Sequence, residues 1–164
     1  MRIHLAADHR GWDLAKQLEG WLASKGHEVL WHGAEFKDDG DDYPLFAIRT
    51  AQAQLADEDD GVEAKSIVVG GDGSGEVISA NKVSGARAAI AMNAKQVELA
   101  RTQADVSLLV IGSYHLNFEQ AQPLVELFFA TPFSDLIDDA RRIINTTEFE
   151  NSGTIEGWMI GYQE

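Results

Sequence analysis

The chain has 164 residues, the length of one ordinary domain, and its 45% hydrophobic content is enough to bury a core, which excludes a disordered chain. Its formal net charge of -14 argues against nucleic acid or an anionic membrane as a partner, because both require clustered lysine and arginine. The absence of cysteine excludes disulfides, cysteine metal sites and a thiolate nucleophile.

Short apolar runs alternate with amphipathic segments along the chain. Strands are predicted at 2–8, 27–33, 65–71, 86–92 and 106–114, and helices at 11–26, 45–57, 76–83, 93–103, 117–131 and 134–150. This alternation predicts an α/β fold: a Rossmann-like, three-layer α/β/α single domain around a five-stranded parallel sheet. We expect the domain to span residues 1–150, with 151–164 as a C-terminal arm docked on a neighbouring subunit.

No apolar run approaches the length that crosses a membrane, and the first residues already read as a strand. We therefore expect a cytoplasmic protein with no membrane partner. In doubly wound sheets, ligands bind outside the carboxyl ends of the strands. That rule brings together the stretches "AADHRG", "VVGGDGSGE" and "VIGSYH".

The stretch "GGDGSGE" places four glycines in six positions directly after a strand and ends on Glu76. Glycines allow tight turns and a close approach of backbone amides to a ligand, and amides at a helix start favour negative charge. The residues Gly71, Asp72, Gly73, Ser74 and Gly75 are therefore predicted to bind substrate. Glu76 has two interpretations: an acid that only complements the helix dipole, or a general base beside an oxyanion-binding loop.

Asp8 and His9 end the first strand and are candidates for moving protons between sugar oxygens. Tyr43 in "DDYP" is a candidate for covering the pocket, and Tyr114 and His115 lie at the end of the fifth predicted strand. The remaining histidines, His4, His27 and His32, are interpreted as packing or surface residues. No metal-ligand spacing stands out, and the acidic run from 38 to 42 is interpreted as a solvated loop, so no metal site is predicted.

Together these stretches resemble the ribose-5-phosphate isomerase B and galactose-6-phosphate isomerase family over residues 1–145. The resemblance is carried by "AADHRGWDLAKQL", by "DYP", by "GGDGSGEVISANKVSGARAA" and by "TPFSDLIDDARRI". The central block is the most specific of these, because it combines the glycine loop with Asn81, Lys82 and Arg87.

The resemblance implies a cofactor-free isomerase of a sugar or sugar phosphate, assembled as a homodimer or tetramer with active sites at the subunit interface. One branch of the family uses a cysteine as base where this chain has Gly70, and the other uses a glutamate where it has Glu76. The implied base is Glu76, moving a proton between C2 and C1 while loop amides hold the enediolate. Asp8, His9 and Tyr43 would contact the sugar.

The phosphate site departs from the family pattern. Tyr114 stands where the family carries a phosphate-binding arginine, and a second such arginine would fall near Asp138, which leaves Arg142 or Arg141 for this role. Each lost charged hydrogen bond is worth roughly 1.5–3 kcal/mol. The sequence therefore leaves four alternatives: isomerisation of ribose 5-phosphate to ribulose 5-phosphate, the same chemistry on a different or unphosphorylated sugar, a non-catalytic subunit paired with an active paralogue, or a nucleotide-binding module without catalysis.

Overall fold

A single parallel sheet with the strand order β2-β1-β3-β5-β4 forms the centre of the computed structural model, which describes residues 1–155. The strands are β1 (Arg2–Ala7), β2 (Glu28–Trp31), β3 (Ala64–Gly70), β4 (Ala88–Ile90) and β5 (Leu108–Gly112). The three central strands, β1, β3 and β5, are buried over nearly their whole length, as their continuous apolar sequences require. The predicted five-stranded parallel sheet is confirmed.

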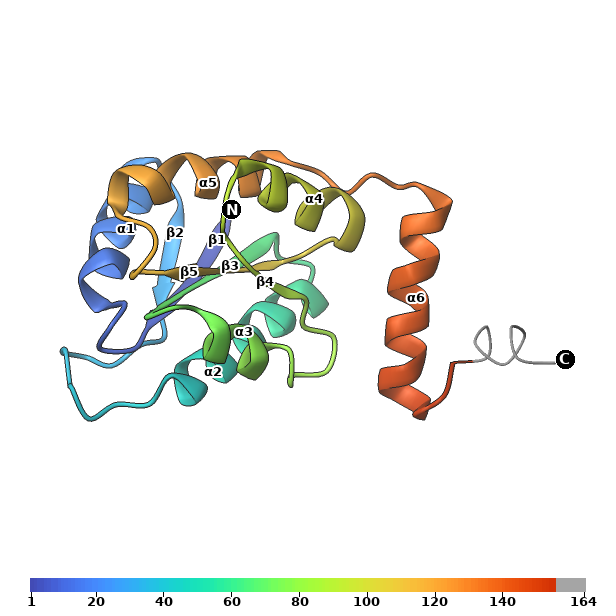
Figure 1. Ribbon diagram of the computed structural model, residues 1–164, viewed down its shortest axis with the longest axis horizontal. Helices are drawn as coiled ribbons and strands as arrows, with labels where there is room; N and C mark the ends of the chain where they lie inside the picture. The colour runs from blue at the N-terminus through green and yellow to red at the C-terminus, as the bar shows by residue number, and fades with distance from the viewer. Residues whose placement is uncertain (156–164) are drawn as a thin grey trace, which may run out of the picture.

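Helices cover both faces of this sheet (Figure 1). They are α1 (Trp12–Ser24), α2 (Tyr43–Asp59), α3 (Ser74–Ala80), α4 (Ala94–Ala104), α5 (Phe118–Ala130) and α6 (Ile137–Ser152). In Figure 1, α1, α4 and α5 lie on one side of the sheet, and α2 and α3 lie on the other. The predicted three-layer α/β/α arrangement is thereby confirmed.

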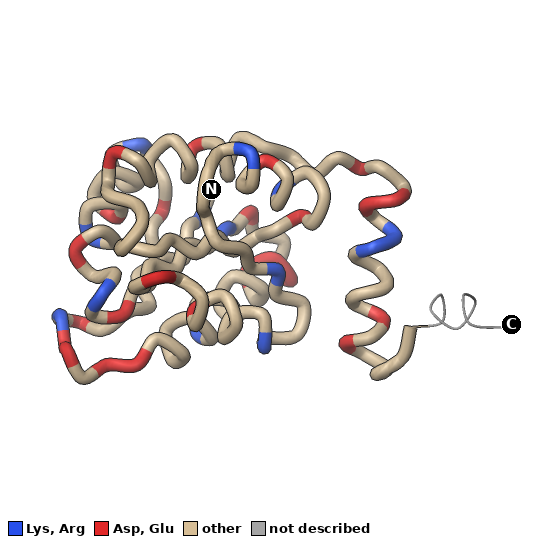
Figure 2. The backbone as a smooth tube through the Cα atoms, in the orientation of Figure 1, with Lys and Arg blue, Asp and Glu red and all other residues tan. Residues whose placement is uncertain are grey.

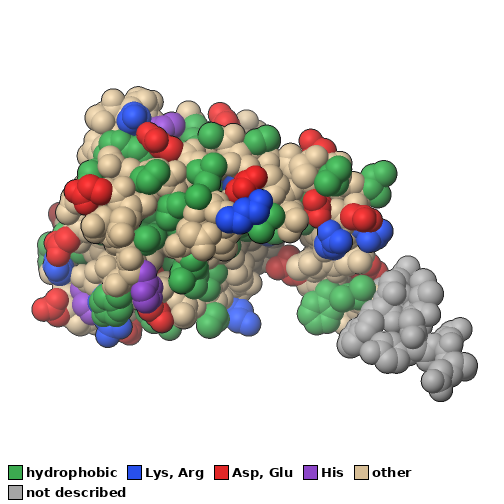
Figure 3. Space-filling model, turned by 45° about the horizontal axis from the view of Figure 1, so that its top comes forward, with side chains coloured by type: hydrophobic (Ala, Val, Ile, Leu, Met, Phe, Trp, Pro, Cys, Tyr) green, Lys and Arg blue, Asp and Glu red, His purple; other side chains and the backbone are tan. Residues whose placement is uncertain are grey.

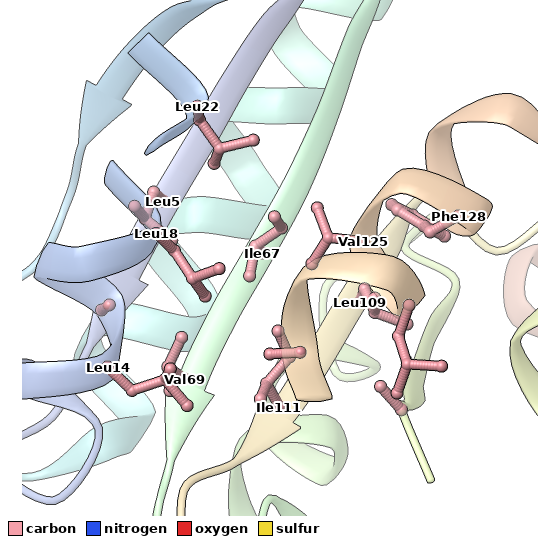
Figure 4. Close-up of a cluster of buried hydrophobic side chains, with 14 of the residues drawn as sticks. Leu5, Leu14, Leu18, Leu22, Ile67, Val69, Leu109, Ile111, Val125 and Phe128 are labelled. Carbon is pink, nitrogen blue, oxygen red and sulfur yellow. The ribbon is translucent and has the colours of Figure 1, made fainter. Parts of the chain in front are cut away.

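The larger hydrophobic core lies between the sheet and the layer of α1, α4 and α5 (Figure 4). Leu14, Leu18 and Leu22 recur every four residues on α1 and present one apolar face to the strands. They meet Ile67 of β3 there, and Phe128 of α5 closes the core further along the sheet. This packing fixes where the carboxyl ends of the central strands lie.

Most element boundaries differ from the sequence predictions by a few residues, and three of these differences have a local explanation. The strand β4 is shorter than predicted, because it lies at the sheet edge and pairs with β5 alone, over Ala88–Ile90. The helix α2 starts two residues earlier than predicted, because Pro44 is well suited to a first helical turn. The helix α6 starts three residues later than predicted, after Asp135 with its positive φ of 55°, and it runs on to Ser152.

The helix α6 stands apart from the three layers, beyond the β4 edge of the sheet (Figures 1 and 3). Of its side chains only Asp139 is buried, whereas Ile137, Ile144 and Phe149 are 84%, 64% and 55% exposed. Most of the predicted arm, residues 156–164, lies outside the described part of the chain. Within residues 1–155, no helix combines the length and apolar character that crossing a membrane requires.

Candidate active site

Three loops meet where the central strands end. The register pairs Gly70 of β3 with Gly112 of β5, so the loops after these strands start side by side. Hydrogen bonds then join them, because the Ser113 N–H donates to the Gly70 carbonyl at 2.9 Å and the Tyr114 N–H donates to the Gly71 carbonyl at 3.0 Å. The Ser113 hydroxyl also donates to the carbonyl of Arg10, in the loop after β1, at 2.9 Å. The predicted meeting of three strand ends is present.

The loop between β3 and α3 depends on glycine at particular positions. Gly73 has a φ of 91°, a left-handed conformation that favours glycine. A side chain on Gly75 would overlap the ring of Tyr43, which starts α2 and covers the loop. Asp72 and Ser74, both predicted to bind substrate, contact each other: the Asp72 carboxylate accepts the Ser74 N–H and hydroxyl at 2.9 and 3.1 Å. These two bonds lower the pKa of Asp72 and stiffen the turn.

The Glu76 side chain is buried, with 3% of its surface exposed, and its carboxyl group lies against Gly70. Any side chain at position 70 would overlap that carboxyl group, so the glycine makes the space that the acid occupies. Burial raises the pKa of Glu76, and the negative charges of Asp8 and Asp72 raise it further. The backbone amides of Glu76 and Gly71 oppose this rise. A carboxylate with a raised pKa is better matched to taking up a proton near neutral pH.

Asp8 and His9 are held in different ways. The buried Asp8 carboxylate accepts the N–H groups of Arg10 and Gly11, both at 3.0 Å, and so shapes the turn after β1. The Nδ1 of His9 lies 2.8 Å from Oδ1 of Asp41, which also accepts the backbone N–H of His9 at 2.9 Å. The hydrogen bond to Asp41 raises the pKa of His9. Because Nδ1 donates to a carboxylate, Nε2 is the nitrogen left to exchange a proton with a substrate.

Asp8, His9 and Asp41 each offer one ligand atom, and these atoms lie within 4.8 Å of one another. Among the described residues, this is the group whose geometry could hold a metal ion. The Nδ1 of His9, however, is already bonded to Asp41. Oδ2 of Asp41 is buried without a hydrogen-bond partner, so this carboxylate retains one free acceptor.

The other predicted residues are divided between this site and a distant one. Tyr43 is 37% exposed over the glycine loop, Tyr114 is 64% exposed beside Gly71, and His115 approaches Gly112. Arg142 is not with them: it lies on α6, pairs with Asp139 at 2.6 Å, and lines a separate cavity of about 620 Å³ between α6 and the sheet edge. Within one chain, the structure therefore does not bring Arg142 to the glycine loop.

Sequence reasoning missed two residues of this site, Asp41 and Arg10. Asp41 belongs to the acidic loop before α2, which Figure 2 shows as a run of acidic residues. The sequence gives no signal for which of these acids faces His9, because the contact joins residues 32 positions apart. The space that Gly70 leaves for Glu76 is likewise visible only in three dimensions.

These features define an α/β protein in which a buried carboxylate faces a loop of backbone amides. A family model described as Ribose/Galactose Isomerase matches residues 3–145, and the chain belongs to this family. Ribose-5-phosphate isomerase B of Mycolicibacterium paratuberculosis is 38% identical over 152 residues, which cover 93% of each chain. The family resemblance of the sequence is confirmed.

Solved structures of the same family superimpose on the chain. Ribose-5-phosphate isomerase B of Clostridium thermocellum has a TM-score of 0.86 at 29% identity, with 94% of this chain and 100% of that chain covered. The Mycoplasma genitalium enzyme, solved with bound ribulose 5-phosphate, has a TM-score of 0.84 at 28% identity, with 92% and 97% covered. The likeness therefore extends over nearly the whole described chain.

Proposed function

We propose that the protein is an aldose–ketose isomerase that converts ribose 5-phosphate to ribulose 5-phosphate with Glu76 as the base. The observation that carries the proposal is the buried Glu76 carboxyl group, with its raised pKa, which lies against Gly70 beside the glycine loop. The relative from Mycolicibacterium paratuberculosis bears the name of this activity, and the Mycoplasma genitalium structure contains its product.

The proposed reaction moves one proton between neighbouring carbons. The ionised Glu76 takes the proton from C2 of the open-chain aldose, and the electrons of that bond form an enediolate whose charge rests on the C1 oxygen. Backbone amides of the loop from Gly71 to Gly75 stabilise this charge. The proton of the C2 hydroxyl moves to the C1 oxygen, and Glu76 returns the carbon-bound proton to C1, which yields the ketose. No oxidant or cofactor is needed.

Asp8 and His9 are proposed to prepare the sugar for this step. Ring opening requires proton exchange between the anomeric hydroxyl and the ring oxygen, and an imidazole that titrates near neutrality suits that task. The Asp41 contact keeps the ring of His9 oriented, and Tyr43 shields the loop from one side. Asp72, Ser74, Tyr114 and His115 would border the bound sugar.

The test is a kinetic comparison of three variants on ribose 5-phosphate. Glu76→Gln removes the base and is expected to lower kcat by roughly 10²- to 10⁴-fold. Gly70→Ala keeps the acid but displaces its carboxyl group, and misplacement by about 1 Å costs on the order of 100-fold. Glu119→Gln is the control, because Glu119 is an exposed acid in the first turn of α5. Turnover by Glu76→Gln at the wild-type rate would show that the acid only complements the helix dipole.

A second candidate function is the same chemistry on a different or unphosphorylated sugar. It is favoured by the position of Tyr114, an uncharged side chain that lies beside Gly71, and by the net charge of -14. Turnover of an unphosphorylated aldose with a lower KM than that for ribose 5-phosphate would select this alternative. A non-catalytic subunit is a third alternative, and the retention of Glu76 argues against it.

We also propose a homodimer or tetramer that works in the cytoplasm, with sites shared between subunits. The supporting observation is α6, which exposes Ile137, Ile144 and Phe149 and lies apart from the three layers. On a second copy, this helix could bring Arg142, which is 64% exposed, towards the glycine loop. Light scattering should give a mass of at least two chains, and Ile144→Glu should lower it. A wild-type monomer would contradict the proposal.

A further inference from the structure

Arg10 is an exposed residue in the loop after β1, and two hydrogen bonds hold its backbone. Its N–H donates to the Asp8 carboxylate at 3.0 Å, and its carbonyl accepts the Ser113 hydroxyl at 2.9 Å. Its side chain runs beside the glycine loop, because a Cβ atom on Gly71 would lie 3.1 Å from Cδ of Arg10 and 3.0 Å from Tyr114. The aliphatic part of the Arg10 side chain therefore lies next to the loop that leads to Glu76.

The Arg10 guanidinium differs from the other arginine side chains in its contacts. Those that form ion pairs with carboxylates are Arg2, Arg87, Arg101, Arg141 and Arg142. Arg49 donates to the carbonyl of His32. Within residues 1–155, the Arg10 side chain has neither an ion pair nor a hydrogen bond. In a chain with 27 acidic residues, its donors are left for a ligand.

Negative charge dominates the surroundings of Arg10. Asp8, Asp41, Asp72 and Glu76 all belong to the site described above, and Asp8 and Glu76 are buried. In the segments that follow β1, β3 and β5 (residues 8–11, 71–73 and 113–117), Arg10 is the one lysine or arginine. A phosphate dianion needs charge-assisted donors to bind among carboxylates, and a guanidinium offers two parallel hydrogen bonds.

We propose that Arg10 binds the phosphate group of the substrate and thereby selects phosphorylated over unphosphorylated sugars. The choice of a sugar phosphate rests on the proposed function, but the anion site itself rests on the geometry of Arg10. In an open-chain pentose 5-phosphate, three carbons and the ester oxygen separate C2 from the phosphorus. A base beside Gly70 and a cation beside Gly71 can hold the two ends of such a molecule.

The experiment measures binding of inorganic phosphate by calorimetry to the full-length wild type and three variants. Arg10→Gln keeps a polar side chain but removes the positive charge, and it is expected to weaken phosphate binding about 10-fold or more. Arg10→Lys keeps the charge and should retain part of the affinity. Lys25→Gln is the matched control, because it makes the same charge change at an exposed residue at the end of α1. It should bind phosphate as the wild type does.

Kinetics supply the second measurement, in which Arg10→Gln should raise the KM for ribose 5-phosphate about 10-fold while kcat changes little. Equal phosphate affinity in Arg10→Gln and the wild type would overturn the inference, whatever the enzyme turns over. An equal loss in Lys25→Gln would also overturn it, because net charge alone would then explain the effect. If the wild type did not turn over ribose 5-phosphate, this would contradict the proposed function instead. The calorimetry would still decide the role of Arg10.

Discussion

The strand β1 contributes two histidine–aspartate pairs to the protein, and they lie in opposite environments. His4, in the middle of the strand, is 2% exposed and contacts Asp57 through Nε2 at 2.9 Å. His9, just after the strand, has a side chain that is 21% exposed and contacts Asp41 through Nδ1 at 2.8 Å. Burial lowers the pKa of His4, whereas Asp41 raises that of His9. The same two residue types therefore give a buried pair in which the pKa of the histidine is lowered and a partly exposed pair in which it is raised.

The neighbours of each aspartate explain the difference. Arg2 donates to both oxygens of Asp57 at 2.9 and 3.0 Å, so the charge of Asp57 is already compensated and His4 can stay neutral. The other ring nitrogen of His4 lies 2.8 Å from Nε2 of His32, which completes a chain of hydrogen bonds under α2. Asp41 has no lysine or arginine within ion-pairing distance among the described residues, so its partner is His9, which compensates the charge of Asp41 when it is protonated.

The largest expected effect is on the buried pair. His4→Ala removes hydrogen bonds to Asp57 and His32 and leaves a cavity, so we expect it to lower the free energy of unfolding by about 2–4 kcal/mol. His9→Ala should cost about 1 kcal/mol or less in stability but should reduce turnover. Denaturant unfolding at pH 7 measures both variants. Similar stability losses in the two would mean that the buried and exposed pairs do not differ as described.

The next largest expected effect is on the pH dependence of stability, to which the buried His4–Asp57 pair contributes through its neighbour His32. Burial lowers the pKa of His32 from 6.5 to about 4. As pH falls through this window, the unfolded chain binds a proton that the folded chain does not, so stability decreases. His32→Gln removes the titrating group, so about 1–2 kcal/mol of this decrease should disappear. The value is kept to this range because the His32 side chain is partly exposed. The control is His27→Gln, outside the hydrogen-bonded chain. An unchanged difference between pH 7 and pH 4 in His32→Gln would contradict the assignment.

The sequence was sufficient for the fold and for part of the site. The apolar runs of β1, β3 and β5 follow directly from burial on both faces, and parallel strands bring their carboxyl ends together without further information. The position of Glu76 beside the glycine loop could be predicted, because the loop and the acid are adjacent in the chain. His4 and His32, interpreted as packing or surface residues, take part in the hydrogen-bonded chain under α2.

The remaining features depend on contacts that the sequence pattern does not encode. Neighbouring acids such as Asp41 and Asp42 are equivalent by composition, and only the path of the loop decides which one reaches His9. The position of Arg142 depends on where α6 lies, and no local signal shows that this helix leaves the three layers. Side-chain pairing also escapes sequence analysis: among the described residues, every arginine except Arg10 has an ion pair or a side-chain hydrogen bond.

The smallest expected effect concerns the charge on Asp41. Asp41→Asn keeps the shape of the side chain but removes the negative charge, so the pKa of His9 should fall. With a raised pKa, the His9 contribution to stability is present below pH 6.5 and is lost as pH rises through the pKa of the folded state. The variant should therefore lose a few tenths to about 1 kcal/mol of stability at low pH and little at high pH.

The matched control for this last variant is Asp42→Asn, which makes the same charge change one residue further on. Asp42 is the exposed N-cap of α2, and its side chain makes no capping hydrogen bond there. NMR titration of the His9 ring protons measures the pKa directly, and the pH–rate profile on the acid side should move with it in Asp41→Asn. Equal shifts of the His9 pKa in both variants would mean that the total negative charge of the loop, and not the hydrogen bond to Asp41, raises this pKa. A shift confined to Asp41→Asn would show that one hydrogen bond sets His9 apart from His4.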